Sequence, residues 1–186
     1  MILQKKKNTF IRRIQRFFPN FAIMNISWSE IKPYENELPT NYADRIGRLY
    51  TDTVTAAFKK SNGQFFTPVS IAYFMGRQIS VNKDFISVLD PGCGTAILSC
   101  AVIENLVLQS KVKRIELVTY ETDENLIPGL QKVLEYITMW GMRHNVRIDC
   151  RSYCEDFILS NYSVLYSDTI YERAENLQKY DLIISN

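Results

Sequence analysis

The hydrophobic pattern in the first half of the chain predicts two amphipathic helices. Over 41–60, apolar residues recur at spacings of three and four, and a Ser-Asn-Gly sequence then interrupts the pattern as a helix end does. A second helix is predicted over 68–79, with Pro68 at its first position and Thr67 as its N-cap. The stretch 21–39 shows no sustained period and is predicted to be an irregular linker.

After residue 80 the pattern changes to strands that alternate with helices. Strands are predicted over 85–90, 114–120, 146–150 and 181–185, and helices over 96–109 and 125–140. Such repeated units predict a doubly wound α/β fold with a mostly parallel sheet, right-handed crossovers and helices on both faces. We therefore divide the chain into a basic arm and linker (1–40), a helical lead-in (41–80) and a partial Rossmann-like domain (81–186), truncated after its fourth strand.

The composition is that of a soluble globular domain, because 46% of the 186 residues are hydrophobic and 23% are charged. No apolar run approaches the roughly 20 residues of a membrane-spanning helix, and the basic start lacks the apolar segment of a signal peptide. A cytoplasmic protein without membrane attachment is expected. Four cysteines stand in apolar stretches without paired spacing, so neither a disulfide framework nor a metal site is expected: Cys93, Cys100, Cys150 and Cys154.

The net charge of +2 conceals a basic arm at the start of the chain. Residues 1–20 hold six Lys and Arg side chains and no acid, which leaves sixteen bases against twenty acids, a net charge of −4, in the remainder. Phe10, Ile14 and Phe17 fall near helical spacing. The arm is either a short amphipathic helix that contacts phosphates or a partner, or a solvated terminus.

A glycine loop joins the first predicted strand directly to an apolar helix. The loop runs through Asp90, Pro91, Gly92, Cys93 and Gly94. Glycines permit a sharp turn and the close approach of a ligand, and a helix start offers free amides. A glycine turn is by itself more often structural, but this one follows the first strand of the series, where doubly wound sheets bind nucleotide-like cofactors.

Acids also follow the second and third predicted strands. Glu121 is placed to accept hydrogen bonds from both ribose hydroxyls, although a surface acid is the alternative interpretation. Because Thr95 and Ala96 stand where a dinucleotide fingerprint needs a third glycine, a nucleoside without a pyrophosphate is favoured. Asp156 and Phe157 could bind an exocyclic amine and cover a ring, or could be an N-cap followed by a core aromatic.

Taken together, these stretches resemble the adenine-N6 DNA methyltransferases of the gamma-type motif order, especially modification subunits of type I restriction systems and fused restriction-modification enzymes. The resemblance covers about 41–186. Gly63 to Pro68 resembles the FFTP-type motif before the sheet, Asp90 to Thr95 the glycine motif, and Tyr120 to Asp123 the ribose motif. The chain ends at Asn186, which resembles the first residue of the catalytic NPPY motif.

This resemblance implies a class I methyltransferase fold, S-adenosylmethionine as cofactor and double-stranded DNA as substrate, with a restriction or specificity subunit as a further partner. The implied cofactor-binding residues are Phe65, Phe66, Thr67, Pro68, Asp90, Pro91, Gly92, Cys93, Gly94, Glu121, Thr122, Asp156 and Phe157. The implied catalytic residue is Asn186, whose side chain accepts a hydrogen bond from the amino group of a flipped-out adenine. Ala96 departs from the family pattern, which has a glycine at this position.

Three other functions remain open at this point. The same fold and motif entry occur in methyltransferases that act on release-factor glutamine or ribosomal RNA. Because the prolines and the aromatic of the catalytic motif are absent, the chain alone is expected to be inactive, and a binding or assembly module is a second alternative. A nicotinamide dehydrogenase is a distant third because the glycine pattern does not fit.

Overall fold

A computed structural model describes residues 26–54, 66–161 and 178–186. Two predictions lie outside these residues: the helical arm before residue 21 and the role of Phe65. The helix predicted over 41–60 ends at Thr51, so its predicted end is wrong, and residues 55–60 lie outside the described residues. Most of the polar stretch between the third and fourth predicted strands also lies outside them.

The structure is built on a four-stranded parallel sheet with the order β3-β2-β1-β4. Its strands are β1 (Phe85–Asp90), β2 (Arg114–Tyr120), β3 (Arg147–Tyr153) and β4 (Leu182–Ile183). The predicted α/β class and parallel sheet are confirmed, and β1 and β2 have the predicted bounds. Strand β3 extends three residues beyond the prediction because its polar end, Arg151 to Tyr153, continues the backbone pairing with Val118 to Tyr120.

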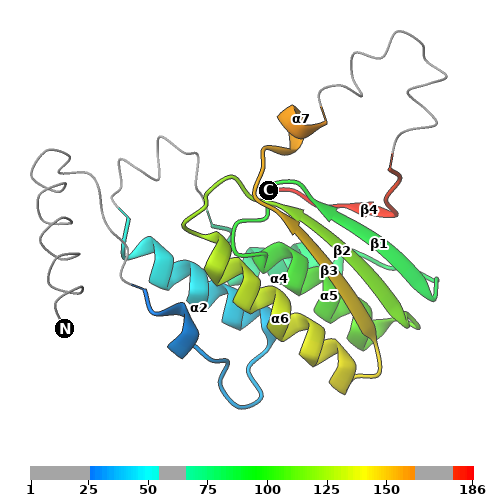
Figure 1. Ribbon diagram of the computed structural model, residues 1–186. Coiled ribbons are helices and arrows are strands. Elements are labelled where there is room, and N and C mark those ends of the chain that lie inside the picture. The colour runs from blue at the N-terminus through cyan, green and yellow to red at the C-terminus, as the bar shows by residue number, and fades with distance from the viewer. Residues whose placement is uncertain (1–25, 55–65, 162–177) are drawn as a thin grey trace, which may run out of the picture.

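The described helices that follow β1 and β2 lie on one face of the sheet (Figure 1). They are α5 (Ile97–Gln109) and α6 (Ile127–Arg143), and α4 (Val69–Arg77) packs against α5 on the same side. Because the chain moves in one direction from β1 to β2 to β3, right-handed crossovers place both connecting helices on the same face. The helices predicted on the second face of the sheet are therefore not present within 26–54, 66–161 and 178–186.

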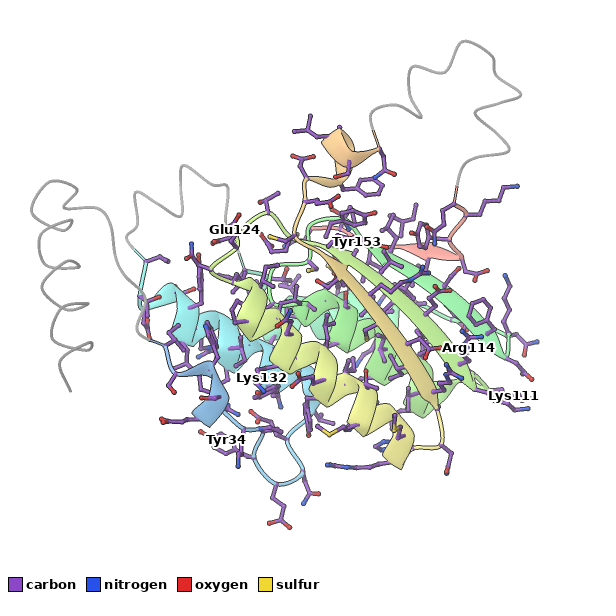
Figure 2. All side chains as sticks on the ribbon, viewed as in Figure 1. Tyr34, Lys111, Arg114, Glu124, Lys132 and Tyr153 are labelled. Carbon is purple, nitrogen blue, oxygen red and sulfur yellow. The ribbon has the colours of Figure 1, made fainter. Side chains whose placement is uncertain are left out.

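The opposite face of the sheet, which these helices do not cover, carries charged side chains on β2 and β3. Arg114 Nε lies 2.9 Å from Asp149 Oδ2 on the neighbouring strand, and Arg151 forms an ion pair with Glu116. Figure 2 shows Arg114 at the amino end of the strands and Tyr153 at the carboxyl end, beside α7 (Phe157–Ser160). No helix in the described part of the chain is long and apolar enough to cross a membrane.

Each of the four helix starts differs from the sequence prediction by one or two residues, and the starts of α2 and α4 have identifiable causes. Helix α2 (Pro39–Thr51) begins two residues early because Pro39 occupies its first turn, where the fixed φ of proline suits a helix, and the preceding linker contains the 3-10 helix η1 (Trp28–Glu30). The prediction that Thr67 caps the second helix is wrong. Pro68 is the N-cap, with its carbonyl oxygen accepting from the amides of Ile71 and Ala72 at 2.9 and 3.0 Å.

Helix α2 is fixed to the sheet-covering layer through a buried carboxylate. Glu104 of α5 accepts hydrogen bonds from the amide and the hydroxyl of Thr40 at 2.5 and 2.7 Å. Burial raises the pKa of Glu104, and the two bonds from Thr40 oppose that rise. The lead-in helix is therefore positioned relative to the Rossmann-like core by a specific polar contact as well as by apolar packing.

Gly76 tests how closely α4 and α5 approach each other. A Cβ at Gly76 would lie 2.7 Å from the carbonyl oxygen of Ala101. The gain in helix propensity from Gly76→Ala, about 1 kcal/mol, is smaller than the cost of separating two packed backbones, so we expect a net destabilisation of about 1–3 kcal/mol in urea unfolding. Gly92→Ala is the control, because a Cβ at Gly92 would meet no protein atom within 4 Å. An equal or greater stability of Gly76→Ala would contradict this packing.

Candidate active site

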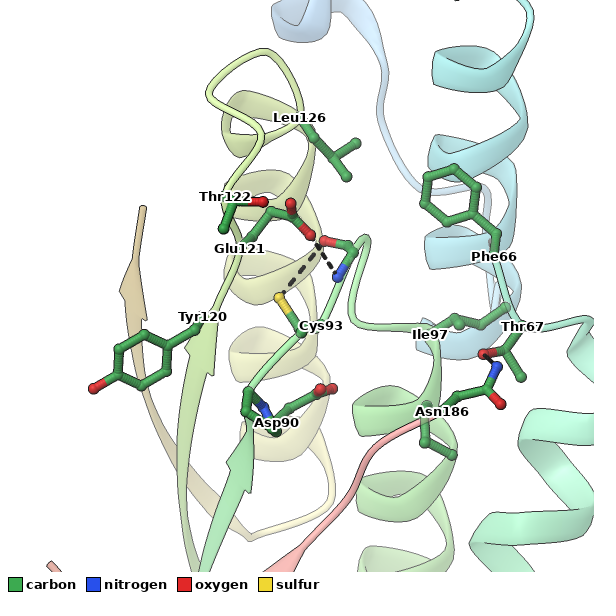
Figure 3. Close-up of a pocket in the computed structure, with 14 residues that line it drawn as sticks. Phe66, Thr67, Asp90, Cys93, Ile97, Tyr120, Glu121, Thr122, Leu126 and Asn186 are labelled. Atoms are coloured by element: carbon green, nitrogen blue, oxygen red, sulfur yellow. Dashed lines mark hydrogen bonds between the residues drawn. The ribbon is translucent and has the colours of Figure 1, made fainter. Parts of the chain in front are cut away.

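A cavity of about 210 Å³ opens at the carboxyl ends of β1 and β2 (Figure 3). Parallel strands end at one edge of a sheet, and the loops that follow them meet there. The lining residues come from the segment before α4, the end of β1 and the glycine loop, α5, the end of β2 and the turn after it, and the segment after β4. They are Phe66, Thr67, Asp90, Pro91, Gly92, Cys93, Gly94, Ile97, Leu98, Tyr120, Glu121, Thr122, Leu126 and Asn186. The structure thus brings together predicted site residues from four separate motifs.

The glycine loop is held in place by the backbone of the neighbouring strand. The amide of Cys93 donates to the carbonyl oxygen of Tyr120 at 2.9 Å, and the amide of Ala96 donates to the carbonyl oxygen of Cys93 at 2.7 Å. Gly94 has a φ of +55°, which favours glycine, and a Cβ there would lie 3.4 Å from the Phe66 ring. The loop therefore turns into α5 with its backbone facing the cavity.

Glu121 bridges the glycine loop and the turn after β2. Its Oε2 accepts from the amide of Gly94 at 2.9 Å, and its Oε1 accepts from the amide of Asp123 at 2.8 Å. A carboxylate oxygen can accept more than one hydrogen bond, so each oxygen retains capacity for a ligand hydroxyl. The two amides fix the carboxylate as a preorganised pair of acceptors.

Asp90 is a buried carboxyl group at the base of the cavity. Burial raises its pKa to about 6, although the Ser99 hydroxyl and the Gly92 amide stabilise the charged form, and the charge of Glu121 raises the pKa further. The Ser99 Oγ donates to Asp90 Oδ2 at 2.5 Å. Asp90 therefore changes its charge just below neutral pH.

Asn186 lies across the cavity from the glycine loop and contacts the lead-in. Its Nδ2 donates to Thr67 Oγ1 at 2.7 Å, over a separation of 119 residues (Figure 3). Two residues earlier, the amide of Ile184 donates to the carbonyl oxygen of Leu89 at 2.9 Å, which anchors the segment to β1.

Three predicted residues that the structure describes do not line the cavity. Asp156 caps α7, with Oδ1 accepting from the amides of Ile158 and Leu159 at 2.8 and 3.0 Å. The Phe157 ring packs edge-on against Tyr120, 5.1 Å between centroids. The N-cap interpretation of Asp156 is confirmed, and the adenine-binding roles of Asp156 and Phe157 stay predictions. The third residue outside the cavity lining is Pro68, at the start of α4.

Sequence reasoning missed one contact that supports the site. The hydroxyl of Tyr50, fully buried in α2, donates to Asp123 Oδ2 in the turn after β2. Tyr50 belongs to the apolar stripe of its helix, which indicates only that it is a core residue. Tyr120, the first residue of the ribose motif, and Leu126, three residues after it, also line the cavity and could have been found by that proximity.

A comparison with known protein families gives a match that covers all the elements that line the cavity. The sequence profile of the N-6 DNA Methylase family matches residues 42–186, from α2 through the glycine loop to the final asparagine. The chain belongs to the N-6 DNA methylase family. The predicted resemblance is therefore confirmed, and α2 and α4 are part of the region that the N-6 DNA methylase profile covers.

Individual N-6 DNA methylase relatives are longer than this chain. The type II methyltransferase M.AccI of Acinetobacter calcoaceticus is 30% identical over 141 residues, which are 76% of this chain and 21% of that protein. The type II methyltransferase M.BsuBI of Bacillus subtilis is 31% identical over 130 residues, which are 69% and 24% of the two proteins. The chain thus spans less than a quarter of the length of these two relatives.

Two solved structures are similar to this chain at low sequence identity. One is a candidate class I S-adenosylmethionine-dependent methyltransferase from Listeria monocytogenes, with a TM-score of 0.41, 17% identity and coverage of 87% of this chain and 41% of that one. The other is a modification subunit of a candidate type I restriction enzyme from Vibrio vulnificus YJ016, with a TM-score of 0.44, 20% identity and coverage of 82% and 29%.

The raised pKa of Asp90 predicts a specific dependence of stability on pH. Between about pH 4 and pH 6 the folded chain keeps a proton on Asp90 that the unfolded chain releases, so the free energy of unfolding falls as the pH rises. The fall reaches up to about 3 kcal/mol for a shift of about two units and is complete above pH 7. Asp90→Asn removes this titration and can keep both hydrogen bonds.

We therefore expect the stability advantage of Asp90→Asn over the wild type to be near zero at pH 4, to grow to pH 6 and to level off above pH 7. Urea unfolding of both proteins across this range measures the difference, in which the other titrating groups cancel. An advantage that is independent of pH, or largest at pH 4, would contradict the buried carboxyl assigned to Asp90.

Proposed function

We propose that this chain is the S-adenosylmethionine-binding part of a DNA methyltransferase that transfers a methyl group to the N6 amino group of adenine. The observation that carries the proposal is the meeting of the glycine loop, Glu121 and Asn186 around one cavity in a chain of the N-6 DNA methylase family. We further propose that the complete protein acts on double-stranded DNA in the cytoplasm, with a restriction or specificity subunit as partner.

The polar groups around the cavity suit a cationic nucleoside. Asp90 and Glu121 supply two carboxyl groups, and no Lys or Arg is found among the described residues that line it. A pyrophosphate would place further negative charge beside these two carboxyl groups, whereas a sulfonium and an ammonium group are attracted to carboxylates. Gly92 adds room, because a Cβ at this position would meet no protein atom within 4 Å. These features support S-adenosylmethionine and disfavour a nicotinamide dinucleotide.

The proposed roles follow from the fixed positions of the side chains. Glu121 would accept hydrogen bonds from the two ribose hydroxyls with the oxygen capacity that the Gly94 and Asp123 amides leave. Asp90, Pro91, Cys93 and Thr122 would shape the loop around the nucleoside. Phe65 to Pro68 would flank the methionine part, and Asp156 with Phe157 would take the adenine ring.

The chemistry is mainly positioning of two reactants. When bound, S-adenosylmethionine supplies a methyl group that is already strongly electrophilic. Asn186 would accept a hydrogen bond from the target amine, which concentrates the nitrogen lone pair and fixes its direction. The target base has to leave the DNA duplex to reach this cavity.

Gly92→Ala tests the cofactor site in the complete protein. Its Cβ meets no protein atom, so the unfolding free energy without ligand should change by less than about 0.5 kcal/mol. Because the same methyl group occupies space beside the cofactor, the Kd for S-adenosylmethionine should rise at least about tenfold in calorimetric titration. Unchanged affinity in the Gly92→Ala variant would place the cofactor elsewhere.

Methyl transfer itself separates the DNA reaction from the alternative substrates. With radioactive S-adenosylmethionine, the complete protein should label DNA, and digestion to nucleosides should release N6-methyladenine. Asn186→Ala should lower the single-turnover rate by about 100-fold or more while keeping the cofactor affinity. Label in release-factor protein or ribosomal RNA, with none in DNA, would favour the alternative methyltransferases.

A further inference from the structure

The hydrogen bond between Thr67 and Asn186 joins the lead-in to the proposed catalytic residue. We propose that Thr67 is a positioning residue, which holds the Asn186 side chain so that its carbonyl oxygen faces the target amine. The proposal rests on the proposed function, in which Asn186 accepts a hydrogen bond from that amine.

Both ends of this hydrogen bond are anchored, and by different parts of the fold. Thr67 is only 6% exposed, and the proline after it restricts its backbone to extended conformations. Asn186 follows Ile184, which is buried against the core and bonded to β1. The relative position of the hydroxyl and the amide is therefore fixed by the packing of α4 and β4, not by the two side chains alone.

The contact uses the donor side of the Asn186 side-chain amide. Each amide carries one donor group and one acceptor oxygen on opposite sides of the same planar carbon. Because Asn186 Nδ2 faces Thr67 Oγ1 at 2.7 Å, Oδ1 points in the other direction (Figure 3). In this orientation Oδ1 remains free to accept a hydrogen bond from the N–H groups of the target amine.

The contact between Thr67 and Asn186 is a single hydrogen bond between two side chains. Such a bond makes only a small net contribution to stability. Loss of the Thr67 hydroxyl should therefore change the rate of methyl transfer much more than it changes folding.

Thr67→Val tests the proposal in the complete protein because valine keeps the branched shape beside the cofactor and removes only the hydroxyl. We expect the single-turnover rate to fall by about 10- to 100-fold, with the Kd values for S-adenosylmethionine and DNA unchanged within about twofold. Thr67→Ser should restore most of the rate. Thr138→Val is the matched control. The Thr138 hydroxyl donates to the carbonyl oxygen of Leu134 at 2.9 Å and lies 3.7 Å from Cys150 Sγ, and Thr138 does not line the cavity.

A double-mutant cycle shows whether Thr67 acts through Asn186. In an Asn186→Ala background, Thr67→Val should cause no further loss of rate, because the side chain that it positions is gone. A readout that is independent of catalysis is the nitrogen-15 spectrum, in which the Asn186 side-chain amide, assigned with Asn186→Ala, should lose its hydrogen-bonded shift in Thr67→Val and keep it in Thr67→Ser.

Three results would overturn the positioning role: a wild-type rate for Thr67→Val, an equal further loss in the Asn186→Ala background, or a large loss of cofactor affinity. If the wild-type enzyme methylates a glutamine or guanine amine instead of adenine, the proposed function fails, but the same cycle on that substrate still decides the role of Thr67. A wild-type enzyme without any methyl transfer would contradict both proposals.

Discussion

Two hydrogen bonds between the glycine loop and the end of β2 hold the candidate site together. The amide of Cys93 bonds to the backbone of Tyr120, and the amide of Gly94 bonds to the side chain of Glu121. Both bonds lie beyond the last paired residues of β1 and β2, Asp90 and Thr119. The bond that holds Gly94 in the loop also fixes the Glu121 carboxylate, which is the proposed acceptor for the cofactor. Folding of the loop therefore places this acceptor before the cofactor binds.

The helical lead-in is part of the site as well as a cover for the core. The Phe66 ring approaches Gly94, Thr67 holds the amide of Asn186, and Tyr50 reaches Asp123 in the turn after β2. These contacts join α2 and the segment before α4 to three separate loops at the sheet edge. Since the N-6 DNA methylase profile begins at residue 42, this lead-in belongs to the region that the family shares.

The predictability of each element follows from its surroundings. Strands β1 and β2 are central and mostly buried, so their apolar runs gave the correct bounds. The end of β3 was missed because its side chains are exposed, although its backbone remains paired. Thr67 was assigned a cap because it precedes Pro68, but its hydroxyl is used by Asn186, and a contact over 119 residues leaves no local signal.

In the site, too, residues of contiguous sequence motifs could be predicted, whereas contacts between distant segments could not. The glycine loop and Glu121 were found because their spacing follows the strands that carry them, and both line the cavity. Asp156 and Phe157 had two interpretations because an acid before an aromatic suits a helix start as well as a nucleobase. Tyr50 could not be assigned to Asp123, since a buried tyrosine in an amphipathic helix has no preferred partner until the tertiary packing is known.

The most direct test of the account is a crystal structure of the complete protein with S-adenosylhomocysteine. We expect the nucleoside to lie in the cavity beside Gly92, with both ribose hydroxyls within hydrogen-bonding distance of the Glu121 carboxylate and Asn186 facing the sulfur side. A ligand bound at another edge of the sheet, or one whose ribose makes no contact with Glu121, would contradict the central claim.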